Sequence, residues 1–211
     1  CHLEDKVHIH KDKIKSFLNQ LDYPLYYLDF ETFSTAIPKF DRLKPYSQVP
    51  FQFSLHVVEK EGEEPKHLEF LYDGNDDPRR EFAESLKDVI GDTGSIVVYN
   101  QSFEISRIKE LGALYPEFKD WSEDVISRVI DLLIPFREYA YYNSSQNGSA
   151  SIKYVLPVLT GEDYSDLEIS SGTVASTEFY NMTYGECSEE EKKDLRKHLL
   201  EYCKLDTLAE V

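Results

Sequence analysis

The segment that most constrains the fold is residues 25–30, where every residue except Asp29 is apolar or aromatic. A nearly continuous apolar run of this length is typical of a β-strand that is covered on both faces. Sheets covered on both faces occur in α/β proteins, where helices pack on each side. The chain is therefore predicted to be an α/β protein in which this strand is the most buried.

The other elements follow from apolar spacing, turn residues and capping signals. Helices are predicted at residues 11–21, 78–90, 100–114 and 188–211, and strands at 51–58, 67–72 and 95–99. The strands at 51–58 and 67–72 are separated by an acidic turn and are expected to be antiparallel neighbours. Residues 125–133 fit either a helix end or a strand, and residues 141–151 are predicted to form a mobile loop. These elements favour a three-layer α/β/α domain with a mixed central sheet of about five strands.

Length and composition limit the class of protein. The chain has 211 residues, 41% of them hydrophobic, which suits one sizeable core. It has no apolar run long enough to cross a membrane and no segment resembling a signal peptide, so we expect a cytoplasmic protein without a membrane partner. The three cysteines, Cys1, Cys187 and Cys203, are far apart and are expected to be reduced thiols.

The ends of the chain suggest that it is part of a longer protein. It begins at Cys1 without a methionine and stops at Val211 inside a helical pattern. We therefore expect residues 1–22 to be an N-terminal helix or linker and residues 23–211 to be the main domain. A flanking domain is then an expected partner.

Two carboxylates project from the predicted buried strand. Asp29 and Glu31 are two residues apart, so on a strand they point to the same face. An unpaired buried carboxylate is unfavourable by several kcal/mol (~2 or more), and a divalent cation with oxygen ligands is one remedy. The alternative is that Glu31 already lies in the following loop and is solvated, as many short acidic pairs are.

Two further acids lie at helix positions that point toward the same end of the sheet. Asp206 falls in the middle of the apolar stripe of the last helix, one turn after Tyr202, unless the helix end frays into water. Glu104 follows the strand at 95–99; its alternative role is to stabilise the helix N-terminus, with Asn100 or Ser102 as the cap. Four convergent carboxylates can hold two divalent ions about 3.5–4 Å apart, the arrangement for displacement at phosphorus.

Three short motifs in this order resemble those of the DEDD exonucleases, a superfamily with the ribonuclease H-like fold. Residues 28–32 (Leu-Asp-Phe-Glu-Thr) look like the first motif, residues 100–104 (Asn-Gln-Ser-Phe-Glu) like the second and residues 202–206 (Tyr-Cys-Lys-Leu-Asp) like the third. Residues 129–133 are similar to an auxiliary stretch. Tyr202, four residues before Asp206, indicates the tyrosine type, because the histidine type would need histidine where Glu201 stands. Residues 50–56 are similar to a string in an uncharacterised bacterial branch.

The resemblance implies a two-metal 3′–5′ exonuclease that releases nucleoside 5′-monophosphates from the 3′ end of DNA or RNA. The cofactors would be two Mg²⁺ or Mn²⁺ ions. Their implied ligands are Asp29, Glu31, Glu104 and Asp206, and Tyr202 would orient or help deprotonate the attacking water. The implied contacts to the terminal nucleotide are Thr32, Asn100 and Phe103.

One departure from the pattern keeps an alternative open. The second motif usually ends in Asp, and Glu104 is longer by one methylene, a displacement of about 1 Å that can reduce catalysis about 100-fold. Together with the formal net charge of −17, which argues against a protein that coats a duplex, this favours as runner-up a catalytically silent domain that binds nucleic acid or a protein partner. An endonuclease using the same metals is a third alternative.

Basic and aromatic side chains outside the motifs are weaker candidates. Lys39, Arg42, Lys44 and Lys153 are candidates for contacts to substrate phosphates, although solvated positions are the simpler interpretation. Three tyrosines, Tyr139, Tyr141 and Tyr142, are candidates for stacking on bases or for ordinary packing.

Overall fold

A computed structural model describes residues 7–211 of the chain as an α/β fold with eight α-helices and a five-stranded mixed sheet. Cys1 and His2 lie outside the described residues. The sheet has the order β4-β3-β2-β5-β6. Its strands are β2 (Leu25–Phe33), β3 (Val49–Val58), β4 (Lys66–Leu71), β5 (Ser95–Val98) and β6 (Val129–Asp131). The coarse prediction of an α/β fold with a mixed sheet is confirmed.

Strand directions in the sheet follow from the connections. β3 is antiparallel to both β2 and β4, whereas β2, β5 and β6 run parallel to one another. The predicted antiparallel pairing of residues 51–58 with 67–72 is therefore confirmed. β2 lies at the centre of the sheet, as expected for its apolar sequence. The prediction that it is the most buried strand was wrong, because β3 is buried along its whole length whereas Asp29 of β2 is partly exposed.

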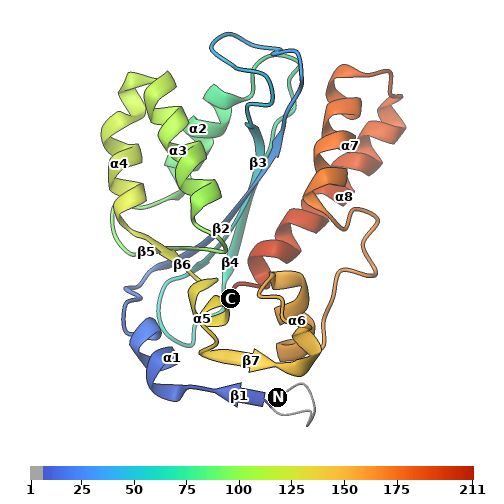
Figure 1. The fold of residues 1–211 in the computed structure, drawn as a ribbon. Helices are drawn as coiled ribbons and strands as arrows, with labels where there is room; N and C mark the ends of the chain where they lie inside the picture. Colours follow the sequence, from blue (N-terminus) through green and yellow to red (C-terminus); the bar gives the residue numbers. More distant parts are fainter. Residues whose placement is uncertain (1–6) are drawn as a thin grey trace.

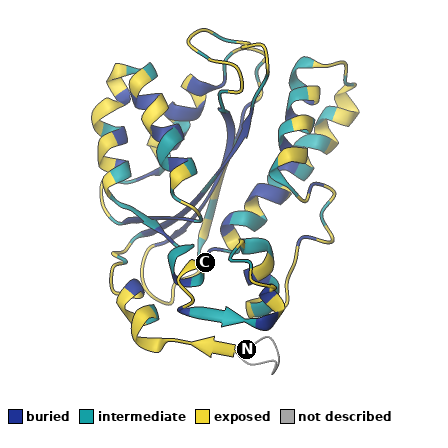
Figure 2. Ribbon diagram, viewed as in Figure 1, coloured by how far each residue is buried: buried dark blue, intermediate teal, exposed yellow. Residues whose placement is uncertain are grey.

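Helices cover both faces of the sheet (Figure 1). α2 (Arg79–Val89), α3 (Ser102–Leu114) and α4 (Lys119–Ser127) pack on one face, where Leu28 and Phe30 of β2 belong to the core. α7 (Gly172–Tyr184) and α8 (Glu189–Leu208) pack on the other, where Phe33 belongs to a second core. Figure 2 shows the buried strands between these two helical layers.

The alternation along β2 decides where its carboxylates point. Because successive side chains on a strand point to opposite faces, Asp29 and Glu31 share the α7/α8 face with Phe33. Opposite Glu31, the ladder between β2 and β3 is interrupted by a bulge that adds one residue to β3. The acidic pair therefore faces the layer that carries the third motif.

A smaller unit lies below the main sheet in Figure 1. β1 (Val7–Ile9) pairs antiparallel with β7 (Tyr141–Asn143), and α1 (Lys11–Leu18) and α5 (Ile134–Arg137) lie beside them. The prediction that residues 141–151 form only a loop was wrong at its start, because Tyr141–Asn143 pairs with a strand too short and too exposed to be recognised from the sequence. Short 3-10 turns follow at Pro116–Phe118 and Ser144–Gln146.

The sequence analysis missed α5, most of α4 and the two helices between residues 151 and 185. α6 (Ile152–Thr160) contains Pro157, and α7 is rich in threonine, serine and aromatic residues that are poor helix formers. Packing compensates for this, because Phe179 of α7 stacks on Phe51 of β3 with ring centroids 3.7 Å apart. By contrast, α8 begins at the predicted capping box. The Ser188 hydroxyl accepts a hydrogen bond from the backbone N–H of Glu191, and the Glu191 carboxylate accepts one from the backbone N–H of Ser188.

Residues 125–133 resolve into both of the structures that their sequence allowed. α4 ends at Ser127 and β6 begins at Val129, so the segment is a helix end followed by an edge strand. Among residues 7–211, no helix combines the length and the apolar character needed to cross a membrane. Cys187 and Cys203 are free, in line with the expectation of reduced thiols.

Candidate functional site

Three of the predicted ligands come together between the sheet and α8. Asp29 and Glu31 of β2 and Asp206 of α8 each offer an oxygen, and these oxygens lie within 4.8 Å of one another. Glu31 is only 6% exposed and lies within β2, so the alternative of a solvated loop residue was wrong. Asp206 lies within α8, and its Oδ1 is buried without a hydrogen-bond partner among the described residues.

Glu104 approaches the same site from the first turn of α3. The residue is 2% exposed, and its Oε2 has no hydrogen-bond partner in the described part of the chain. It lies outside the tight cluster of the other three carboxylates, although its charge raises the pKa of both Asp29 and Glu31. The helix-capping alternative does not explain an unpaired, buried carboxylate oxygen.

The four carboxyl groups all have raised pKa values because burial penalises their charged forms. The pKa of Glu31 rises to about 8 through burial and the charge of Asp206, and that of Glu104 rises to about 8 through burial, with Asp131 adding and Arg107 opposing. Burial, then Asp206, raises the pKa of Asp29 well above its usual range. Burial also raises that of Asp206, opposed by the hydroxyls of Tyr164 and Tyr202. A cation would relieve this repulsion.

The donor set of the site suits a hard divalent cation. It consists of carboxylate oxygens alone, and two of them, Glu104 Oε2 and Asp206 Oδ1, are buried and unpaired. Mg²⁺ and Mn²⁺ prefer such oxygen ligands, whereas softer metals prefer sulfur or imidazole. The residues present therefore fit the metal that the motif resemblance implies.

A helix N-terminus faces Glu31, and the sequence analysis missed it. A Cβ atom added at Gly172, the first residue of α7, would lie 3.3 Å from Glu31 Oε2. The N-terminal end of a helix stabilises negative charge through its dipole and its free N–H groups. No sequence signal indicated this contact, because α7 itself was not predicted.

Tyr202 is buried beside the cluster as the third motif predicted. It is 3% exposed, and burial followed by the charges of Asp206 and Glu31 raises its pKa far above the ordinary value. The raised pKa favours the neutral phenol in the metal-free protein, and a neutral phenol can donate a hydrogen bond. Of the two roles that the resemblance implied, orienting a water molecule fits this environment better than removing its proton.

Lys153 is the one cation that the described structure brings to the cluster. Its ammonium lies 5.0 Å from the centre of the Tyr164 ring and 5.3 Å from that of Tyr202, and it donates to the carbonyl of Ser170. Its charge lowers the pKa of Glu31. The side chain is partly exposed, so α6 places it beside the site without removing it from solvent.

The sequence analysis missed two further site residues. Tyr164 is 6% exposed, and its hydroxyl, like that of Tyr202, lowers the pKa of Asp206. Glu210 is 6% exposed, its Oε2 is unpaired in the described structure, and burial followed by the charges of Asp29 and Glu104 raises its pKa well above the usual range. Neither residue lies in a motif, so only the folded arrangement reveals them.

The three predicted substrate contacts lie close in sequence to Glu31 or Glu104, at the ends of β2 and β5. Thr32 is 8% exposed, and its hydroxyl donates to Gln48 Oε1 at 2.6 Å. Asn100 is exposed in a left-handed turn (φ 80°), where its N–H donates to Asp131 Oδ1 at 2.9 Å. Phe103 is partly buried, with the Arg107 guanidinium 5.3 Å from its ring centre. Asp131, from the auxiliary stretch, thus holds the turn that leads into Glu104.

The weaker candidates have other neighbours. The Lys39 ammonium lies 3.8 Å from the centre of the Tyr184 ring, so it packs on the α7 layer. Tyr139 contacts Tyr142, and Tyr141 contacts Phe136, which fits ordinary packing around β7.

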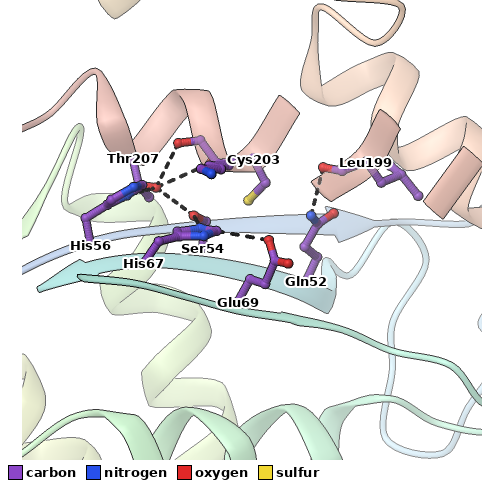
Figure 3. A network of polar contacts seen from close by, with 9 residues as sticks. Gln52, Ser54, His56, His67, Glu69, Leu199, Cys203 and Thr207 are labelled. Atoms are coloured by element: carbon purple, nitrogen blue, oxygen red, sulfur yellow. Dashed lines mark hydrogen bonds and ion pairs between the residues drawn. The ribbon is translucent and has the colours of Figure 1, made fainter. Parts of the chain in front are cut away.

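A second buried polar cluster lies beside the acidic one, and we call it the hydroxyl–histidine network (Ser54, His56, His67 and Thr207; Figure 3). Thr207 Oγ1 lies 2.6 Å from Ser54 Oγ and 2.8 Å from His56 Nδ1, and Ser54 Oγ lies 2.9 Å from His67 Nε2. Thr207 follows Asp206 directly in α8. The network therefore fastens the end of α8 to β3 next to the carboxylates.

Fold and site together define an α/β domain with a buried, all-carboxylate cluster on its central strand. The chain belongs to the family described as Domain of unknown function (DUF2779), whose model matches residues 26–151. The matched part includes Asp29, Glu31 and Glu104, whereas Tyr202 and Asp206 lie beyond it.

Curated relatives from mycoplasmas cover nearly the whole chain. It is 28% identical to "Uncharacterized protein MG366 homolog" of Mycoplasma pneumoniae and 27% identical to "Uncharacterized protein MG366" of Mycoplasma genitalium, over 94% of this chain in each case. It is 26% identical to "Uncharacterized protein UU173" of Ureaplasma parvum over 87% of this chain. The chain spans about a third of the length of these relatives, 32%, 32% and 29% respectively. No solved structure matches it significantly.

Proposed function

We propose that this domain is a metal-dependent 3′–5′ exonuclease with a ribonuclease H-like fold, acting on the 3′ end of DNA or RNA. The observation that carries the proposal is the convergence of oxygens of Asp29, Glu31 and Asp206 within 4.8 Å, from one strand and one helix far apart in the sequence. The buried Glu104 and Tyr202 at the same site strengthen it. Few structural roles require so many unpaired carboxylates in one core.

The sheet also supports the proposed fold. Numbered along the chain, its five strands lie in the order 3-2-1-4-5, and only the second, β3, runs opposite to the others. This is the arrangement of a ribonuclease H-like sheet. The first motif then lies on the central strand and the second follows the fourth strand, as the resemblance requires.

The proposed reaction is hydrolysis of the terminal phosphodiester to a nucleoside 5′-monophosphate and a strand shortened by one nucleotide. Asp29, Glu31, Asp206 and Glu104 would hold two Mg²⁺ or Mn²⁺ ions, and these would supply activation of the attacking water and stabilisation of the leaving 3′ oxygen. Tyr202, a neutral phenol, donates a hydrogen bond that orients the attacking water.

Three neighbouring side chains would assist this reaction by balancing charge or by positioning the substrate. Lys153 balances part of the negative charge, because its ammonium lowers the pKa of Glu31 and Asp206. Thr32 and Phe103, the sequence neighbours of Glu31 and Glu104, would position the terminal nucleotide. The expected product has a 5′-phosphate because attack occurs at phosphorus and the 3′ oxygen leaves.

The test is a 5′-labelled single-stranded oligonucleotide, as DNA and as RNA, incubated with Mg²⁺ or Mn²⁺. We expect stepwise loss of 3′ nucleotides that stops in the Asp29→Asn variant. Asp88→Asn is the matched control, since Asp88 is exposed on α2 and forms no ion pair within residues 7–211. Failure to degrade either nucleic acid with either metal would contradict the proposal, and internal cuts would favour an endonuclease.

A catalytically silent, nucleic-acid-binding domain is the second candidate. The position of Glu104 outside the tight carboxylate cluster favours it, because one compact metal site is then easier to form than two. Calorimetric titration with Mn²⁺ separates the two functions. Two sites with turnover support the exonuclease, and one site with oligonucleotide binding but no turnover supports the silent domain.

A further inference from the structure

A cavity of about 330 Å³ lies between the loop that follows β2 and the helices α2 and α3. Its polar lining is mostly cationic, although the whole chain carries a net charge of −17. Its charged lining residues are Arg42, Lys44, Arg79, Arg107 and Glu110. Four cations around one acid make this cavity a positive region on an acidic protein.

Two of the four cations are held firmly. Arg79 is paired with Asp77 and donates to the carbonyl of Asp41 at 3.0 Å, and Arg107 is paired with Glu110 at 2.7 Å. Both arginines are less than a tenth exposed, which is rare for this residue type. They give the cavity a rigid wall of two arginine–carboxylate pairs, so the excess positive charge of the lining comes from Arg42 and Lys44.

The other two cations are free to meet a ligand. Arg42 and Lys44 are exposed on the loop after β2, and neither forms an ion pair within the described part of the chain. Guanidinium and ammonium groups bind phosphate oxygens through charge-assisted hydrogen bonds. The cavity therefore presents two unpaired donors in front of two fixed ones.

Direct contacts connect the cavity to the carboxylate site. Gln48, another lining residue, accepts the hydrogen bond of Thr32, the residue that follows Glu31. The Arg107 guanidinium lies 5.3 Å from the centre of the Phe103 ring. The cavity is therefore linked by single contacts to Thr32 and Phe103, two of the proposed contacts to the terminal nucleotide.

We propose that this cavity binds backbone phosphates of the nucleotides on the 5′ side of the terminal nucleotide. The inference rests on the proposed function, because that function supplies the strand whose 3′ end enters the carboxylate site. The ligand class is a single-stranded phosphodiester, DNA or RNA. The cavity supplies the attraction to phosphate that the net charge of the chain opposes.

The test measures binding, so it does not depend on cleavage. Fluorescent oligothymidylate and oligouridylate, as dinucleotides and as octanucleotides, are titrated over a range of salt concentrations without divalent metal and, separately, with Mn²⁺ in the Asp29→Asn background. The variant is Arg42→Asn with Lys44→Gln, since Asn tolerates the left-handed backbone at Arg42 (φ 62°). The control is Lys13→Gln with Lys109→Gln, two exposed lysines without ion pairs among residues 7–211.

We expect the cavity variant to bind the octanucleotide about tenfold more weakly than wild type and to leave dinucleotide binding unchanged. The slope of log affinity against log salt falls in magnitude by about 1.4, because each single-strand phosphate contact contributes about 0.7. Octanucleotide binding equal to that of the control pair overturns the inference, as does a wild-type protein that binds neither octanucleotide.

The outcome is separable from that of the proposed function. If wild type degrades strands from the 3′ end while the cavity variant binds normally, the cavity inference is wrong and the exonuclease stands. If wild type degrades nothing but the cavity variant still loses octanucleotide binding, the cavity holds nucleic acid and the exonuclease proposal fails.

Discussion

Two buried polar clusters lie side by side on the same face of the sheet and use the same helix, yet they differ in one respect. In the hydroxyl–histidine network, Ser54, His56 and Thr207 have hydrogen-bond partners within 2.8 Å. In the carboxylate cluster, Asp206 Oδ1 and Glu104 Oε2 are buried and unpaired among the described residues. One cluster is neutral and satisfied, and the other is acidic and unsatisfied.

This difference distinguishes buried polar groups that stabilise the fold from buried polar groups that serve a function. A hydrogen-bonded hydroxyl in a core stabilises the fold modestly and fixes one helix position, whereas an unpaired buried carboxylate destabilises it. The end of α8 carries both kinds, since Thr207 and Asp206 are neighbours. The network therefore holds the carboxylates in place against their own repulsion, and four predictions test this division of roles.

The largest expected effect is at Asp29, where we expect a substitution to lower activity and raise stability. Asp29→Asn replaces a carboxyl group whose charged form is disfavoured by burial and by the other carboxylates, so we expect activity to fall about 1000-fold or more while the metal-free protein becomes more stable. Cleavage assays and urea unfolding in chelator measure the two changes. If the variant loses both activity and stability, Asp29 stabilises the fold, as the residues of the hydroxyl–histidine network do.

Metal should remove the difference between the clusters by supplying the missing positive charge. Mn²⁺ at 100 times its dissociation constant is expected to stabilise wild type by about 2.7 kcal/mol, seen as a rise in Tm. The Asp29→Asn variant should show little of this rise, and Asp88→Asn should show all of it. An equal rise in all three proteins would mean that the ion binds elsewhere.

Thr207→Val should have the opposite signature to Asp29→Asn. It leaves the groups that face Thr207, Ser54 Oγ and His56 Nδ1, without this partner, so we expect a loss of about 2 kcal/mol in the free energy of unfolding. Thr177→Val is the control, because Thr177 is exposed on α7 and bonds only the carbonyl one turn back. A loss no greater than in the control would show that the network does not fasten α8.

The smallest predicted effect is the pH dependence contributed by His56. Burial, with the charges of His67 and Lys204, lowers the pKa of His56 to about 4. The folded protein therefore binds fewer protons than the unfolded chain between pH 4 and the ordinary value of 6.5, so the stability contributed by neutral His56 is lost as pH falls through this range.

The measurement compares wild type with His56→Gln between pH 7 and pH 5. We expect wild type to lose about 1–2 kcal/mol more than the variant over this interval. The buried carboxylates have raised pKa values and act in the opposite direction, but they are present in both proteins and cancel in the difference. His198→Gln on α8 is the control. If the free energy of unfolding changes equally with pH in all three proteins, His56 does not contribute to the pH dependence.

The sequence predicted much of the sheet and part of the site because those features depend on local pattern. The apolar run around Asp29, the antiparallel pair that follows it and the capping box at Ser188 are all short-range signals, and each matches the structure. Asp206 was recognisable because an acid in the apolar stripe of a helix is anomalous wherever the helix packs.

Other features depended on contacts between distant segments and left no local signal. α7 has few good helix formers and is stabilised by packing such as that of Phe179 on Phe51, so its contact with Glu31 through Gly172 was not foreseen. Lys153 was not placed beside the cluster because α6, with its internal proline, was not recognised. Tyr141–Asn143 was read as loop because its partner strand lies more than a hundred residues away.

By itself, the sequence determined the central strand, its two carboxylates and the helix that brings Asp206 and Tyr202, because spacing along one strand or one helix decides which face a side chain takes. Only the tertiary structure decided that Glu31 is buried at the N-terminus of α7, that Lys153 and Glu210 join the cluster, and that Thr207 is tied to β3. These are consequences of how layers pack, and the burial of a charge and the pairing of a hydroxyl exist only once those layers meet.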